Sequence, residues 1–215
     1  ADGYSMTQTY ISATVEADGS LTVVEGRQFD FDDDINGVFW EINTGTNQQG
    51  GTAGVDVLSV EEEDTAFNKV DSANKGDSGV YTVEQTGDGV RIKVFSPHES
   101  GDSAIYYVGY TMTGAVMNWA DTAELYWKFV GDGWSADSDD VEMEVYFANA
   151  AAGTAAVKGD NFRAWGHGPL TGDVSLDADE PMVTYTIPCV HQGEFAEARI
   201  AFPSDWVPQL TASGE

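Results

Sequence analysis

The chain has 215 residues, of which 41% are hydrophobic and 12% aromatic, a composition typical of folded globular proteins and not of disordered chains. Its 37 acidic residues against 9 Lys and Arg give a formal net charge of −28. Because so negative a surface repels phosphate backbones and anionic lipids, we expect no nucleic-acid partner. Solubility is the simplest role of this charge, and divalent cations, a cationic partner or a saline habitat are the alternatives.

The cysteine content limits both disulfides and metal sites. The single cysteine, Cys189, rules out a disulfide within the chain. Cys189 and His191 stand two residues apart, which places both on one face of a strand, but the sequence shows no third group that would make a thiol catalyst. We therefore interpret Cys189 as a small buried hydrophobe. Three scattered histidines with one cysteine match no zinc-site spacing.

Short alternating apolar runs, separated by Gly, Asp and Asn clusters, recur along the chain, whereas helical periodicity is nearly absent. This pattern predicts an all-β fold, an antiparallel β-sandwich of about ten strands. The clearest hairpin pairs residues 9–16 with residues 21–31 across an Asp-Gly turn. In its second arm Glu25 and Arg27 interrupt the apolar positions, which predicts a bulge or an exposed middle.

The next part of the chain carries an apolar patch at 38–42, a strand at 55–60 and a second hairpin that pairs residues 80–85 with 90–95. Between these strands, residues 61–79 are polar and lack alternation. This segment is predicted to form a long, mobile loop.

The segment 105–134 has the densest aromatic content and is predicted to form the core. From Ile105 to Tyr110 both alternating sets look apolar, which indicates a strand buried on both faces. Residues 120–124 are predicted to continue into the strand that carries Trp127, in preference to a helical turn.

We place a domain boundary after the Gly-Asp-Gly break at 131–133. Residues 1–134 would form an N-terminal β-sandwich and residues 135–215 a smaller immunoglobulin-like sandwich, with one continuous domain as the alternative. An alanine-rich link at 148–157 reads as a loop or a brief helix. Strands in this second part are predicted at residues 141–147, 162–165, 174–176, 182–187 and 195–202.

The Gly-Asp-Ser-Gly sequence at 76–79 reproduces the nucleophile motif of chymotrypsin-like proteases, whose serine needs a histidine base. The three histidines, His98, His167 and His191, all follow Ser78, whereas that family places its histidine well before the serine. We interpret the motif as a turn. Glycoside hydrolysis needs a pair of carboxylates, but in so acidic a chain close pairs of carboxylates are expected by chance and do not indicate this activity. We therefore expect a protein that is not an enzyme.

Asp32, Asp34 and Asn36, followed by a glycine, have the spacing that opens a calcium-binding loop. The closing glutamate is missing, because Asn43 stands at its position, although Glu41 is close. Calcium is the only cofactor that the sequence suggests, and an acidic solvated turn is the alternative. A melting temperature that responds to neither calcium nor chelator would refute the calcium hypothesis.

The tryptophans raise a carbohydrate alternative, since exposed aromatic faces bind the apolar faces of sugars. We favour core packing for most of them, and Trp119 exposed beside Trp127 would reverse that preference. The six are Trp40, Trp119, Trp127, Trp134, Trp165 and Trp206.

Four stretches together resemble a known family. They are Gly19-Ser20-Leu21-x-Val23-x-Glu25, the segment 31–42 with Gly37-Val38, Ala123-Glu124-Leu125-Tyr126-Trp127-Lys128-Phe129-Val130-Gly131, and Gly166-His167-Gly168-Pro169-Leu170-x-Gly172. The resemblance spans about residues 4–202 and is to the extracytoplasmic part of bacterial predicted membrane proteins, the domain of unknown function 2207. It implies an exported protein whose membrane anchor lies outside this fragment. The family has no assigned chemistry, so it brings no catalytic residues.

The sequence therefore predicts a non-enzymatic β-sandwich module on the extracytoplasmic face of the bacterial membrane. It would bind, sense or act as a spacer, with a protein or glycan partner at the cell surface. The alternatives are a carbohydrate-binding or carbohydrate-active domain and a calcium-dependent adhesion module. A glycan array with a hydrolysis screen separates the non-enzymatic module from the carbohydrate domain. Cleavage of a glycan would refute the non-enzymatic module, and no signal in either assay would remove the carbohydrate domain.

Overall fold

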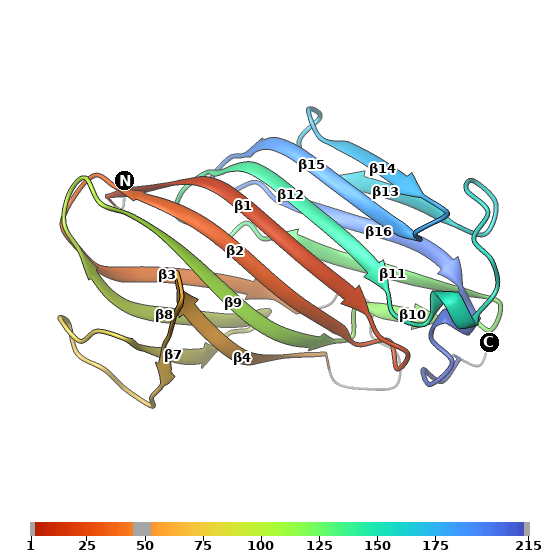
Figure 1. Ribbon diagram of the computed structural model, residues 1–215, viewed down its shortest axis with the longest axis horizontal. Coiled ribbons are helices and arrows are strands. Elements are labelled where there is room, and N and C mark those ends of the chain that lie inside the picture. The colour runs from red at the N-terminus through yellow and green to blue at the C-terminus, as the bar shows by residue number, and fades with distance from the viewer. Residues whose placement is uncertain (1–2, 45–52, 213–215) are drawn as a thin grey trace.

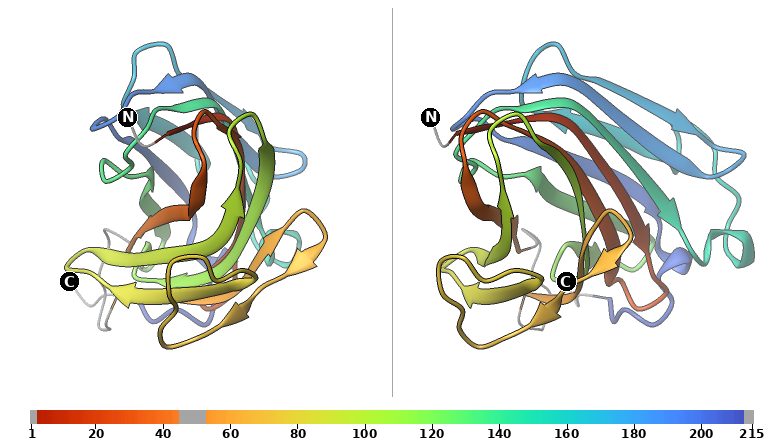
Figure 2. Two further views of the ribbon diagram at one scale, coloured as in Figure 1. Left: turned by 90° about the vertical axis from the view of Figure 1, so that its left-hand side faces the viewer. Right: turned by 60° about the vertical axis from the view of Figure 1, so that its left-hand side comes forward.

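A computed structural model describes residues 3–44 and 53–212. In this part of the chain a curved eight-stranded sheet faces two four-stranded sheets, which both lie behind it in Figure 1. The two further views show the same curved layer from its end (Figure 2). The predicted all-β sandwich is confirmed. None of the described helices is long and apolar enough to span a bilayer.

The large sheet contains, in spatial order, β14 (Asp173–Asp177), β15 (Met182–Val190), β12 (Ser138–Phe147), β1 (Tyr4–Val15), β2 (Leu21–Phe31), β9 (Ser103–Thr113), β4 (Gly54–Glu62) and β5 (Thr65–Ala66). One small sheet contains β10 (Val116–Asn118), β11 (Thr122–Val130), β16 (Ala196–Pro203) and β13 (Arg163–His167). The other contains β3 (Ile35–Asn43), β8 (Gly89–His98), β7 (Val80–Gln85) and β6 (Asn68–Lys69). Two single-turn 3-10 helices, η1 (Ala150–Ala152) and η2 (Ser204–Trp206), complete the described elements.

Hydrogen-bonded strand pairs cross the position where the sequence suggested a domain boundary. β1 pairs with β12 in parallel, so that Ile11 lies opposite Met143. β11 pairs with β16, so that Leu125 lies opposite Ile200. Buried residues from both sides of residue 134 belong to one connected core. The segments before and after residue 134 therefore share two sheets and one core.

The first hairpin forms as predicted, but its second arm differs from the expectation. Glu25 and Arg27 are both buried and point inward from β2, and the register of β2 against β1 is regular there. The irregularity lies instead in β1, between Met6 and Gln8. The predicted bulge or exposed middle at Glu25 and Arg27 is wrong, because the two side chains compensate each other's charge inside the core.

This buried pair has a defined set of partners. The Arg27 Nε donates to Glu25 Oε2 at 3.3 Å and its Nη1 donates to Ser138 Oγ at 2.7 Å. The guanidinium carbon lies 3.7 Å from the centre of the Trp134 ring, a cation–π contact, and 5.7 Å from that of Trp40. Burial raises the pKa of Glu25, and the positive charge of Arg27 opposes that rise.

Two other expectations need correction. The run 61–79 is not one loop, because β4 extends to Glu62, where the side chain accepts a hydrogen bond from Ser96 Oγ, and β5 and β6 follow. β9 is not buried on both faces, because Tyr107 is exposed on its outer face. Tyrosine tolerates that position since its hydroxyl remains in water. The strand predicted from residues 120–124 is confirmed as β11.

Replacing Arg27 by Met should lower the free energy of unfolding by about 3–5 kcal/mol, because it leaves the Glu25 carboxyl buried without its counter-charge. Urea denaturation measures this change. The folded variant should keep Glu25 protonated at a pH where the unfolded chain has lost that proton. The contribution of Glu25 to its stability should therefore be fully present below the unfolded pKa of Glu, about 4.3, and be lost as the pH rises through the raised pKa of the folded state.

The double variant with Glu25→Gln should recover much of the loss, because no buried charge remains. As a matched control, Arg91→Met breaks a partly exposed pair with Glu41, whose atoms are 3.2 Å apart, and should cost less than about 1 kcal/mol. An Arg27→Met protein as stable as the Arg91→Met protein would contradict a stabilising role for the buried pair.

Candidate functional site

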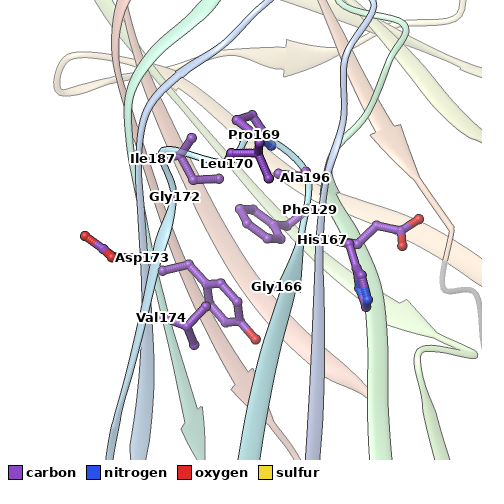
Figure 3. Close-up of a pocket in the computed structure, with 13 residues that line it drawn as sticks. Phe129, Gly166, His167, Pro169, Leu170, Gly172, Asp173, Val174, Ile187 and Ala196 are labelled. Carbon is purple, nitrogen blue, oxygen red and sulfur yellow. The ribbon is translucent and has the colours of Figure 1, made fainter.

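A cavity of about 210 Å³ opens between the β14–β15 edge of the large sheet and the strands β11, β16 and β13. Phe129 and Ile187 line it, and Pro169 and Leu170 lie over them (Figure 3). Tyr185 adds a second ring, whose centre is 5.4 Å from that of Phe129. The cavity is thus apolar inside, and Asp173 and Glu197 contribute to its lining.

The loop over this cavity joins β13 to β14 and depends on its glycines. Gly168 has a φ of 147°, and a Cβ there would lie 2.7 Å from the Phe195 carbonyl oxygen, so only glycine fits. A Cβ on Gly172 would lie 3.2 Å from Ile187 Cγ1. The Gly-x-Gly-Pro-Leu-x-Gly pattern of the sequence therefore builds the roof of the cavity.

A second hollow, of about 370 Å³, lies further along the same two strands. Val174 lines both hollows, which makes them parts of one groove between β13 and β14. We call this groove the seam. Besides the cavity residues its lining includes Lys158, Phe162, Arg163, Ala164, Trp165 and Leu176.

The strands on the two sides of the seam, β13 and β14, are each the last strand of a sheet among the described residues. Exposed apolar side chains gather here, because Trp165, Val174 and the fully exposed Leu170 all line the seam. Two of the nine basic residues, Lys158 and Arg163, line it as well. Apolar and basic groups therefore occur together in the seam, alongside the carboxylates of Asp173 and Glu197 at the cavity.

The structure brings three polar residues together at the end of the β12–β15 pair. Asp139 lies opposite Cys189 in that pair, so Asp137, just before β12, approaches His191, just after β15. The Asp137 Oδ2 lies 3.2 Å from His191 Nδ1 and 3.9 Å from Cys189 Sγ. The Cys189 Sγ lies 3.4 Å from His191 Nδ1.

Charges around this cluster shift its pKa values. Burial, together with a hydrogen bond to Asp139 and the negative charges of Asp139 and Asp137, raises the pKa of Cys189 to about 12. The hydrogen bond with Asp137 raises the pKa of His191. The interpretation of Cys189 as a buried hydrophobe without a third group is wrong. The sequence did not reveal Asp137, because only strand pairing joins it to residues more than fifty positions later.

The candidate calcium residues lie in and after the turn between β2 and β3. Asp32, Asp34 and Asn36 are exposed, and Asp34 Oδ1 accepts a hydrogen bond from the Ser100 N–H at 2.9 Å. Asn36 belongs to β3 and lines a separate hollow beside Phe39. The calcium hypothesis for these residues stays a prediction.

The histidines occupy three separate places. His98 contacts Glu62 through Nε2 and Asp102 through Nδ1, the latter at 3.2 Å, and its ring stacks on Phe31 with centres 4.8 Å apart. His167 is on β13, and its side chain points away from the cavity (Figure 3). These contacts indicate that His98 has a structural role, in which it packs on one strand and forms hydrogen bonds to other parts of the chain.

Core packing is confirmed for four of the tryptophans, Trp40, Trp127, Trp134 and Trp206, while Trp119 and Trp165 are exposed. Trp127 is buried, so the exposed pair of Trp119 and Trp127 does not exist. A different aromatic pair is exposed on the large sheet, where Tyr10 and Tyr107 flank Gly26. They line a hollow of about 260 Å³ together with Gln8 and Gln28.

The described strands form an all-β sandwich domain with a groove, the seam, between the last strands of two of its sheets. Residues 5–202 match the model of a family described as the N-terminal domain of predicted membrane proteins, DUF2207. The chain belongs to this family, and the resemblance seen in the sequence is confirmed. The family description supports membrane association.

Solved structures share the fold at low sequence identity. A proposed nutrient-binding protein from Legionella pneumophila has a TM-score of 0.56 at 11% identity, over 93% of this chain and 67% of that one. Leukotriene A4 hydrolase from Saccharomyces cerevisiae has a TM-score of 0.51 at 9% identity, over 92% of this chain and 29% of that one. An M1 zinc metallopeptidase from Deinococcus radiodurans has a TM-score of 0.50 at 9% identity, over 92% of this chain and 42% of that one.

These likenesses concern the fold alone, and the chain spans less than half the length of the hydrolase and the peptidase. No curated protein matches the chain.

Proposed function

We propose that this chain is the extracytoplasmic binding domain of a membrane-anchored bacterial protein, and that it binds an extended segment of a partner protein in the seam. The observation that carries the proposal is the apolar seam between two edge strands, β13 and β14. Membership of a family of predicted membrane proteins supports the membrane anchor.

An extended segment suits the seam because the groove follows two neighbouring strands, β13 and β14, whose backbones lie close together. The segment would lie in this groove, over side chains of both strands. The hollow of about 370 Å³ continues the groove, and the cavity of about 210 Å³ lies at its end. The cavity would hold one apolar side chain, which would pack on Phe129 and Tyr185 and act as an anchor.

The charge of the seam indicates the composition of the segment. Lys158 and Arg163 lie along the groove, beyond Val174 from the cavity. Acidic residues in the partner would complement these two side chains, which favours association and fixes the direction of the segment. The preferred segment is therefore an apolar anchor residue with acidic neighbours on one side.

Selection of linear peptides from a random phage-displayed library against this domain tests the proposal. We expect binders with the composition given above. Val174→Glu and Leu170→Asp should each weaken binding of the best peptide by about tenfold or more, because both place a charge in the apolar seam. Fluorescence anisotropy of the labelled peptide measures the dissociation constants.

The matched controls are Val24→Glu and Leu58→Asp, which make the same changes at exposed positions of β2 and β4 on the large sheet. They should change the affinity less than about twofold, since they add the same charge away from the seam. A selection that yields no binders, or binders that Val174→Glu and Val24→Glu affect equally, would overturn the seam as the binding site.

The extracytoplasmic address predicts that the domain is accessible to protease added to spheroplasts of cells that make the full-length protein. A protease recognition site inserted after Gly76 provides the cleavage point, because nothing lies within 4 Å of a Cβ built there. Immunoblotting should show cleavage in intact spheroplasts, while a cytosolic protein with the same insertion stays whole. Cleavage of both proteins only after lysis would place the domain inside the cell.

Glycan binding is the second candidate, and the Tyr10–Tyr107 hollow is the observation that favours it. Two exposed tyrosine rings and two glutamine amides are groups that stack on and hydrogen-bond to sugars. A glycan array that gives no signal above that of a Tyr10→Ala, Tyr107→Ala protein would remove this candidate.

A further inference from the structure

The Asp137–Cys189–His191 cluster is the group of three His, Cys, Asp or Glu residues that, within the described part of the chain, has ligand atoms converging within 4.8 Å. It lies outside the residues that line the seam. Its three donors differ in kind: a carboxylate, a thiol and an imidazole. Each is a ligand type found in protein zinc sites.

The spacing of the donor atoms matches that of a tetrahedral ion. Bonds of about 2.3 Å to sulfur, about 2.0–2.1 Å to nitrogen and about 2.0–2.2 Å to oxygen place tetrahedral ligand atoms about 3.4–3.6 Å apart. The three distances in the cluster are 3.2, 3.4 and 3.9 Å. A shift of roughly 0.2–0.3 Å in each distance would convert the hydrogen-bonded cluster into a set of metal ligands.

The surroundings of the cluster suit a cation. The second oxygen of Asp137, Oδ1, accepts a hydrogen bond from the Gln192 N–H at 2.7 Å, which holds the carboxylate and leaves Oδ2 toward His191 and Cys189. Asp139 and Glu194 act on Cys189 through their negative charges. Their field, which disfavours a bare thiolate, favours a divalent cation at the same place.

The site is reachable from solvent, because the side chains of His191 and Asp137 are 65% and 46% exposed. We propose that Asp137, Cys189 and His191 bind one zinc ion, with water as the fourth ligand. The sulfur donor separates this site from a calcium site, since calcium takes oxygen ligands. It also separates the site from carboxylate groups elsewhere on the acidic surface.

Cobalt substitution tests the site in the intact domain. Titration with Co²⁺ should give one equivalent of bound metal with a thiolate-to-cobalt charge-transfer band and the visible bands of a tetrahedral ion. Zn²⁺ should displace the cobalt and abolish both signals. Cys189→Ser should remove the charge-transfer band, and Asp137→Asn and His191→Ala should each weaken binding by about tenfold or more.

The matched controls are His167→Ala and Asp173→Asn, which remove an exposed imidazole and an exposed carboxylate away from the cluster. They should leave the Co²⁺ affinity within about twofold of the unmodified protein. Circular dichroism establishes that each variant is folded, which the exposure of the replaced side chains favours.

Three results would overturn the proposal. The first is the absence of a charge-transfer band at stoichiometric Co²⁺. The second is a band that survives unchanged in both Asp137→Asn and His191→Ala, which would mean that the thiol binds metal alone. The third is weak binding that Cys189→Ser and His167→Ala reduce equally, which is the behaviour of a non-specific acidic surface.

Discussion

The buried Arg27–Glu25 pair is the interaction on which the arrangement of the three sheets depends. Arg27 comes from the large sheet, Trp40 from β3 of one small sheet, and Trp134 from the connection after β11 of the other. Its hydrogen bond to Ser138 fixes the first residue of β12. A guanidinium in a core needs groups that compensate its charge, and Arg27 takes them from elements in or next to all three sheets. Its Nη2 has no hydrogen-bond partner among the described residues. Any packing that separates these elements would leave the buried charge uncompensated.

The sequence predicted the elements well and their long-range pairing poorly. Alternation located both hairpins and β12, because a half-buried strand must alternate. The same rule failed at Glu25 and Arg27, where charge compensation within β2 overrides the preference of charged residues for the surface. Nothing local to Ile11 or Met143 indicates that they become neighbours in a parallel pair.

The candidate sites show the same difference between local features, which the sequence reveals, and long-range pairing, which it does not. The glycine-rich loop over the cavity was visible as a pattern, because steric demands on glycine are local. The seam was not visible, since it exists only where β13 and β14, the edges of two different sheets, lie side by side. The Asp137–Cys189–His191 cluster needed the β12–β15 pairing for the same reason. Two members were recognised by their spacing in sequence, and the third was not.

The parallel pairing of β1 with β12 also governs the order in which this chain can fold. β1 precedes the other described strands in the chain, yet its neighbour β12 ends at Phe147, and β15 on the far side of β12 ends at Val190. Until those residues arrive, the edge of β1 that faces β12 is unpaired and Arg27 lacks Ser138. Contacts so distant in sequence slow folding and leave strand edges available for aggregation. The large sheet of this domain therefore stays incomplete until β12 and β15 are present.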